Sequence, residues 1–175
     1  VKPVQKSIGF LGRLHPIKKV ENLLRGAALA ISKGCHPFTI EIMGKGSEEY
    51  EQFLWNEVER LSLKEVVHFI GFVNGKEKYD RLGKLHALMV PSEQENFGMI
   101  VPEALICGTP VYASLGTPWQ ELNDEACGWW RDNTPETIAE VITEIVSLSN
   151  EEIIQMGGRG RALIERKYEQ LRVAT

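Results

Sequence analysis

The sequence predicts an α/β fold in which six parallel strands form one sheet and helices cover both of its faces. Two observations support this prediction. Short apolar runs alternate along the chain with segments whose apolar residues recur at helical spacing. The runs are apolar throughout, which is typical of parallel strands that are buried on both faces. A chain of 175 residues, 43% of them hydrophobic, is also long enough to bury a core as one domain.

Six apolar runs are expected to be strands, because each is short and lies between segments with helical spacing. They lie at residues 7–14, 38–46, 66–72, 87–92, 110–114 and 128–131. We expect the domain to span residues 7–168, with a linker at residues 1–6 and a tail at residues 169–175.

The segments between these runs are expected to be helices. Residues 20–34 repeat leucine and alanine on one helical face, and residues 47–63 begin with a serine cap and several acidic residues. Residues 75–86 form a short polar helix, and residues 134–168 contain two helices that begin after Thr134 and near Asn150.

The helix over residues 99–108 has the clearest signals at its ends. Pro102 is tolerated only in the first turn of a helix, so this helix begins near residues 99–101. Gly108 is expected to end it.

Composition excludes several classes of function. The net charge of −4 argues against nucleic acid or an anionic membrane surface as the main partner. The three cysteines form no CxxC pair and are expected to be reduced thiols, and the four histidines show no metal-ligand spacing, so no metal site is expected. No apolar run is long enough to span a membrane. Because the chain begins without Met, we expect it to be a fragment.

The chemically unusual residues follow the strands. In parallel sheets of this kind, ligands bind at the carboxyl ends of the strands, where these residues would meet. They are Gly12-Arg13, Gly44-Lys45-Gly46, Phe72-Val73, Ser92 to Gly98, and Ser114 to Thr117.

The loop GRLHPIKK at residues 12–19 carries two cations just before a helix. A helix N-terminus favours anions, Arg13 adds a fork of donors and Lys18 adds a point charge, so the loop suits a diphosphate. A solvated basic loop explains the same residues equally well. The segment GKGSEE at residues 44–49 has no third glycine, and it follows the second strand rather than the first, which excludes a nicotinamide cofactor. A tight turn at Gly44 explains it better than a phosphate contact.

Two glutamates with seven residues between them stand in SEQENFGMIVPEALICGTPV, residues 92–111. Glu95 lies in the loop before the helix and Glu103 in its first turn, so both are expected at the binding edge of the sheet. A carboxylate can accept two hydrogen bonds and so matches a vicinal diol. A ligand made of sugar, diphosphate and ribose would fit this order. A solvated Glu95, with Glu103 merely complementing the helix dipole, is an equal alternative.

Several segments together resemble a known family. In chain order they are GRLHPIKK, IEIMGKG, VHFIGFV, ALMVPSEQENFG, MIVPEALICGTPVYAS and CGWW. They resemble the C-terminal, donor-binding domain of retaining glycosyltransferases of the GT-B fold, the glycosyl transferases group 1 or family 4. The resemblance covers residues 7–168 and includes the E-x7-E pattern of that family. It implies a Rossmann-like, three-layer α/β/α domain that forms one half of a GT-B fold.

The resemblance implies roles for individual residues. Arg13 and Lys18 look like the pair that neutralises the donor diphosphate, Glu95 like the acid at the donor sugar, and Glu103 like the acid that holds the ribose hydroxyls. Further donor contacts are implied for Gly12, Gly44, Phe72, Val73, Ser92, Asn96, Phe97, Gly98, Met99 and Ile100. Phe72, Val73 and Ser92 fall where the family contacts the base.

The chain also departs from the family pattern. Lys19 stands where the family commonly has glycine, and Asn96 is larger than the usual residue between the first acid and the phenylalanine. The loop LGTPWQEL at residues 115–122 lacks the usual paired glycines. The path of the first loop and the sugar end of the pocket are therefore expected to differ.

The resemblance implies a transferase that needs no cofactor or metal and uses a UDP- or GDP-sugar as its donor substrate. The acceptor site is expected in a preceding N-terminal domain that this chain lacks. The intact enzyme is expected to be cytoplasmic, to associate peripherally with the cytoplasmic face of a membrane, and to bind no nucleic acid. Two alternatives stay open: half of a nucleotide-sugar epimerase, which shares the fold, and a non-catalytic nucleotide-binding module.

Overall fold

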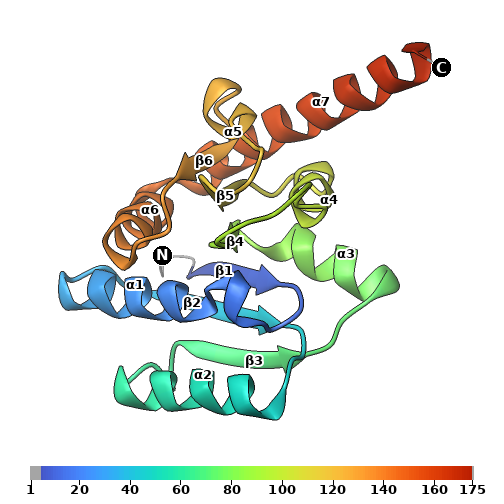
Figure 1. Cartoon of the computed structure of the whole chain (residues 1–175). Coiled ribbons are helices and arrows are strands. Elements are labelled where there is room, and N and C mark those ends of the chain that lie inside the picture. The colour runs from blue at the N-terminus through green and yellow to red at the C-terminus, as the bar shows by residue number, and fades with distance from the viewer. Residues whose placement is uncertain (1–4, 175) are drawn as a thin grey trace.

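Strands and helices alternate along the chain in the computed structural model, which describes residues 5–174 (Figure 1). The strands are Lys6–Leu11 (β1), Phe38–Met43 (β2), Val67–Gly71 (β3), Ala87–Val90 (β4), Val111–Ser114 (β5) and Gly128–Arg131 (β6). The helices are the 3-10 turn Pro16–Lys18 (η1), Val20–Ser32 (α1), Glu48–Arg60 (α2), Gly75–Lys84 (α3), Ile100–Ile106 (α4), Glu121–Asp124 (α5), Pro135–Ser147 (α6) and Asn150–Ala174 (α7).

The six strands form one parallel sheet in the order β3-β2-β1-β4-β5-β6. β1 is central, with Ile8 opposite Ile40 of β2 on one side and Ala87 of β4 on the other. The chain first builds the sheet outward from β1 to β3 and then returns to the other side of β1. The strand order therefore reverses between β1 and β4, and such a reversal opens a crevice at the carboxyl ends of the strands. The predicted fold class is confirmed.

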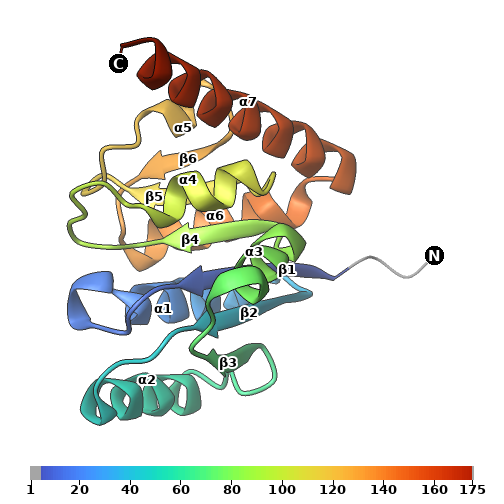
Figure 2. The ribbon, with the colours of Figure 1, turned by 90° about the vertical axis from the view of Figure 1, so that its right-hand side faces the viewer.

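Each face of the sheet has its own hydrophobic core. In β4, Ala87 and Met89 pack into the core beneath α1, α2 and α6, whereas Leu88 and Val90 pack into the core beneath α3, α4 and α7. Figure 2 shows α4 and α7 in front of the sheet and α6 behind it. Because both faces are covered, every residue of β4 and β5 is buried, which explains why these runs are apolar at each position.

The helix signals read from the sequence hold in the structure. α4 begins at Ile100, two residues before Pro102, and Gly108 lies just beyond its end with a φ of 79°. Ser47 and Thr134 cap α2 and α6, since their hydroxyls accept hydrogen bonds from the backbone N–H groups of Tyr50 and Thr137. η1 and α5 were not predicted, because elements of three and four residues are too short to show a period.

Both ends of the described chain differ from the expected boundaries. β1 begins at Lys6, inside the stretch expected to be a linker, because Lys6 pairs with Phe38 and is buried. Residues 1–4 lie outside the described residues. α7 continues through residues 169–174, which were expected to be a tail, since no proline or glycine after Gly160 interrupts it.

α7 lies close to the end of α4 because glycines line the contact. A Cβ atom added at Gly157 would lie 2.0 Å from the carbonyl oxygen of Gly108, whereas one added at Gly158 would meet no atom within 4 Å. Gly157 is buried and Gly158 is exposed. Gly157 therefore has no room for a side chain, whereas Gly158, the next residue in the same helix, does.

Replacing Gly157 with alanine should lower the free energy of unfolding by about 1–3 kcal/mol, because the new methyl group collides with backbone. Replacing Gly158 with alanine should raise it by roughly 0.5–1 kcal/mol, because alanine loses less backbone entropy in a helix. Denaturant titration of the two variants measures both changes. Changes of the same sign would contradict the close approach of α7 to Gly108.

Candidate functional site

The loops after β1 and β2 are packed together by backbone contacts at the carboxyl edge of the sheet. The N–H of Gly12 donates to the carbonyl of Met43 at 3.0 Å, and the N–H of Leu14 donates to the carbonyl of Lys45 at 2.9 Å. A Cβ atom at Gly44 would lie 1.8 Å from the carbonyl oxygen of Gly12. Gly44 is therefore required for the close contact between the two loops, which agrees with its interpretation as a turn residue.

Lys18 and Glu95 lie on the two loops that flank the reversal of strand order. The Lys18 ammonium forms an ion pair with Glu95 Oε1, and the hydroxyl of Ser92 donates to the same oxygen at 3.0 Å. Both charged side chains are mostly covered, with 23% and 17% of their surfaces exposed. Two residues separated by 77 positions in the chain are thereby brought into contact at the carboxyl edge of the sheet.

Backbone contacts fix the path of the loop that carries Glu95. The N–H of Glu93 donates to the carbonyl of Ile17 at 2.8 Å, and the N–H of Glu95 donates to the carbonyl of Gly116 at 3.0 Å. The indole N–H of Trp119 donates to the carbonyl of Phe97 at 2.8 Å. The loop after β4 is thus joined both to the loop after β1 and to the loop after β5.

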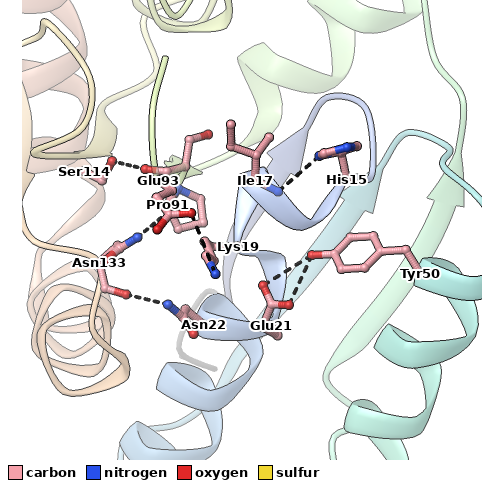
Figure 3. Close-up of polar contacts among 11 residues, drawn as sticks. His15, Ile17, Lys19, Glu21, Asn22, Tyr50, Pro91, Glu93, Ser114 and Asn133 are labelled. Carbon is pink, nitrogen blue, oxygen red and sulfur yellow. Dashed lines mark hydrogen bonds and ion pairs between the residues drawn. The ribbon is translucent and has the colours of Figure 1, made fainter.

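Hydrogen bonds from partly buried asparagines and a buried serine connect the same loops to α1 and to the end of β6. Asn133 donates to the carbonyl of Pro91 at 3.0 Å and accepts, through its own carbonyl, a hydrogen bond of 3.0 Å from the Asn22 side chain (Figure 3). The Ser114 hydroxyl donates to the carbonyl of Ser92. These bonds pair the carbonyl groups of Pro91 and Ser92, which follow β4. They therefore fix the start of the loop that carries Glu95.

Glu103 is paired with a second lysine. Its Oε2 atom is buried and forms an ion pair with the ammonium of Lys78 on α3. The hydrogen bond that the Lys78 ammonium donates to Glu103 raises the pKa of Lys78 above its ordinary value, and burial acts in the opposite direction. The same ammonium lies 5.1 Å from the centre of the Tyr79 ring. Lys78 therefore stays charged and attached to Glu103.

The remaining predicted site residues differ in how much of their surface is exposed. Arg13 is exposed and forms no ion pair within the described range 5–174. The apolar side chains of Phe72, Phe97 and Met99 are exposed. Asn96 is exposed, Gly12 and Ile100 are half-buried, and Gly98 is buried with a φ of 59°.

Val73 and Ser92 are not available to a ligand through their side chains. Val73 is part of the core beneath α3 and α4. Ser92 has no exposed surface, and its hydroxyl is directed to Glu95. Of the three residues expected at the base, only Phe72 presents an accessible side chain.

Sequence reasoning missed Lys78 and Trp119. Lys78 is one of several charged residues in a polar helix, and nothing in the local pattern distinguishes it from a solvated lysine. Trp119 lies in the loop that departs from the family pattern, and its position there was a usable signal.

Lys19 adopts a left-handed backbone conformation with a φ of 53° and a ψ of 41° between η1 and α1. Glycine reaches this conformation at no steric cost, which accounts for the expectation of glycine at this position. Its ammonium lies 3.9 Å from Glu93, an exposed and therefore weak ion pair (Figure 3).

The described residues contain neither a metal-binding cluster nor a membrane-spanning helix. No group of three or more His, Cys, Asp or Glu side chains within residues 5–173 is arranged to hold a metal ion. No described helix is long and apolar enough to cross a membrane.

Comparison with known proteins identifies the family. The model of the glycosyl transferases group 1 family matches residues 2–162. The chain belongs to this family. In this glycosyl transferases group 1 domain, Glu95 and Glu103 each pair with a lysine.

Relatives and solved structures agree with this assignment. An uncharacterized glycosyltransferase of Methanocaldococcus jannaschii, MJ1607, is 31% identical over 153 residues, which cover 84% of this chain and 37% of the relative. The O-antigen biosynthesis glycosyltransferase WclY of Escherichia coli is 27% identical over 140 residues, or 80% of this chain and 37% of WclY. The chain thus spans little more than a third of the length of these relatives.

Solved structures share the fold. The C-terminal domain of LpcC, a glycosyl transferase group 1 family protein from Francisella tularensis, superposes with a TM-score of 0.80 at 22% identity and covers 95% of this chain and 87% of that domain. HepE of Anabaena, in complex with UDP-glucose, gives a TM-score of 0.79 at 24% identity over 93% of this chain and 44% of HepE. The chain therefore has the architecture of a C-terminal GT-B domain.

Replacing Lys19 with glycine should raise the free energy of unfolding by up to about 1 kcal/mol. The left-handed conformation costs a non-glycine residue about 1–2 kcal/mol, and the backbone entropy of glycine offsets about 0.5–1 kcal/mol of this gain. Lys33, at the other end of α1, has a φ of −96° and is the matched control. Lys33→Gly should lower the free energy of unfolding in the same denaturant titration, and a loss of similar size at Lys19 would refute the account.

Proposed function

We propose that this chain is the nucleotide-sugar binding half of a retaining, metal-independent glycosyltransferase that transfers a hexosyl group from a donor to an acceptor. One observation carries the proposal. Lys18 and Glu95 meet across the crevice between β1 and β4, so a cation suited to a diphosphate lies next to a carboxylate suited to sugar hydroxyls.

The chemistry of each group fits one part of the donor. Lys18 and the exposed Arg13 would stabilise the negative charge that develops on the departing diphosphate, a form of electrostatic catalysis that needs no metal. Glu95 would accept hydrogen bonds from the hydroxyls of the transferred sugar. Glu103, one turn into α4, would accept hydrogen bonds from the ribose.

The relatives support a UDP- or GDP-sugar as the donor. HepE was crystallised with UDP-glucose, and a Mycobacterium tuberculosis relative that is 27% identical over 83% of this chain is described as GDP-mannose-dependent. The description of WclY as an O-antigen biosynthesis enzyme supports a role in cell-surface polysaccharide or lipopolysaccharide synthesis. Such a role would place the intact enzyme in the cytoplasm, in peripheral contact with the membrane.

The acceptor site would belong to the part of the relatives that this chain does not match. We therefore expect this domain alone to bind donor weakly and to catalyse no transfer. Family membership over residues 2–162 favours transfer over the epimerase and over a non-catalytic module.

The first test is a calorimetric binding panel of uridine, guanosine and adenosine diphosphates and their sugars. At millimolar ligand, one base series should bind, and the nucleotide-sugar should bind more tightly than its nucleoside diphosphate. If no member of the panel binds, donor binding by this domain is wrong.

The second test compares the effect on nucleotide binding of replacing Glu103 with that of replacing an exposed acid in the first turn of another helix. Glu103→Ala should weaken nucleoside diphosphate binding about tenfold, the effect of losing a hydrogen bond to a charged group. Glu151 is the matched control, because it is an exposed acid in the first turn of α7. Equal losses in the two variants would exclude the ribose role.

A further inference from the structure

Each acid of the E-x7-E pattern is held through one oxygen only. Glu95 receives both Lys18 and Ser92 at Oε1, and Glu103 receives Lys78 at Oε2. The other oxygen of each carboxylate makes no hydrogen bond within the described residues, and the Glu95 and Glu103 side chains keep 17% and 23% of their surfaces exposed. Both carboxylates are thus anchored on one side and open on the other before any ligand binds.

We propose that Ser92 and Lys78 are positioning residues that aim the free oxygen of each acid at a different part of the donor. Ser92 acts through Glu95 on the transferred sugar, and Lys78 acts through Glu103 on the ribose. This inference rests on the proposed function. Neither residue needs to contact the donor itself.

The surroundings of Ser92 suit this role. The side chain has no exposed surface, so it cannot meet a ligand, and its hydroxyl lies 3.0 Å from Glu95 Oε1. Its own carbonyl accepts a hydrogen bond from the Ser114 hydroxyl, which holds the backbone of Ser92 in place. When Lys18 moves toward a diphosphate, the bond from Ser92 keeps Glu95 oriented.

Lys78 reaches Glu103 from a different helix. The two side chains are each 23% exposed, and the oxygen that Lys78 contacts is the buried one. A buried carboxylate oxygen without a cation would be costly, so the pair holds the carboxylate in a single orientation. The remaining oxygen, Oε1, has two lone pairs and can accept from one or both ribose hydroxyls.

The ion pair with Lys78 leaves Glu103 one oxygen for the ribose. A free carboxylate could accept hydrogen bonds from a diol at both oxygens, but one oxygen of Glu103 already pairs with Lys78. Ribose recognition through Oε1 alone depends on how accurately Lys78 fixes the rotation of the carboxylate.

Two affinity ratios separate the two roles. The sugar ratio compares a nucleotide-sugar with its nucleoside diphosphate, for example UDP-glucose with uridine diphosphate. The ribose ratio compares a nucleoside diphosphate with its 2′-deoxy and 3′-deoxy analogues. Both are measured by calorimetry on the same chain, with the base that the wild type binds.

Ser92→Ala should lower the sugar ratio about fivefold, less than the loss of a direct hydrogen bond to the ligand, because Glu95 then keeps only Lys18 to orient it. The ribose ratio should stay unchanged. Lys78→Met should lower the ribose ratio about fivefold and leave the sugar ratio unchanged. Lys78→Arg should restore the ribose ratio in part, since arginine keeps the charge. Each variant thus serves as the control for the other.

Ser114→Ala provides a matched loss of a buried hydroxyl in the same network, since that hydroxyl contacts the Ser92 carbonyl and not Glu95. It should lower the sugar ratio less than Ser92→Ala does. Thermal unfolding of every variant tests whether the fold is retained. A variant that fails to fold is replaced by Ser92→Cys or Lys78→Gln.

The outcomes distinguish this inference from the proposed function. If the wild type binds no nucleotide-sugar, the proposed function fails and the inference fails with it. If the wild type binds donor but the ratios move together in both variants, or do not move, the positioning roles are wrong while donor binding stands. A wild-type sugar ratio of one would overturn the role of Ser92 alone.

Discussion

The site depends on one constraint, the reversal of strand order between β1 and β4 in a sheet that is buried on both faces. Parallel strands end at the same edge, and the reversal sends the two neighbouring loops to opposite sides of one crevice. Lys18 and Glu95 meet there although 77 residues separate them. Without the reversal, the cation and the carboxylate would follow strands that are not neighbours.

Hydrogen bonds within the protein hold the loops of the site together. Glycine permits backbone to lie on backbone at Gly44, and the carbonyls at the end of β4 accept hydrogen bonds from Asn133 and Ser114. Buried polar groups that are fully paired fix a single arrangement, whereas unpaired ones would be costly. Two charged pairs can therefore stay partly covered at an edge that is otherwise open.

The ion pairs have a consequence for binding. Each candidate acid has a lysine as its partner, so the proposed donor would meet carboxylates whose charge is partly compensated. Under the proposed function, a diphosphate would compete with Glu95 for Lys18. Lys78 has no such competitor on the proposed ligand and remains a structural partner.

The sequence alone determined the strands, the long helices and the edge at which the site lies, because apolar periodicity and Pro102 are local signals. It also determined that Glu95 and Glu103 reach that edge. Only the tertiary structure decided which atoms meet: that Ser92 is turned inward to Glu95, that Val73 is a core residue, and that a lysine of α3 holds Glu103. The physical reason is that a strand or helix follows from neighbours in the chain, whereas a side-chain partner follows from how distant segments pack.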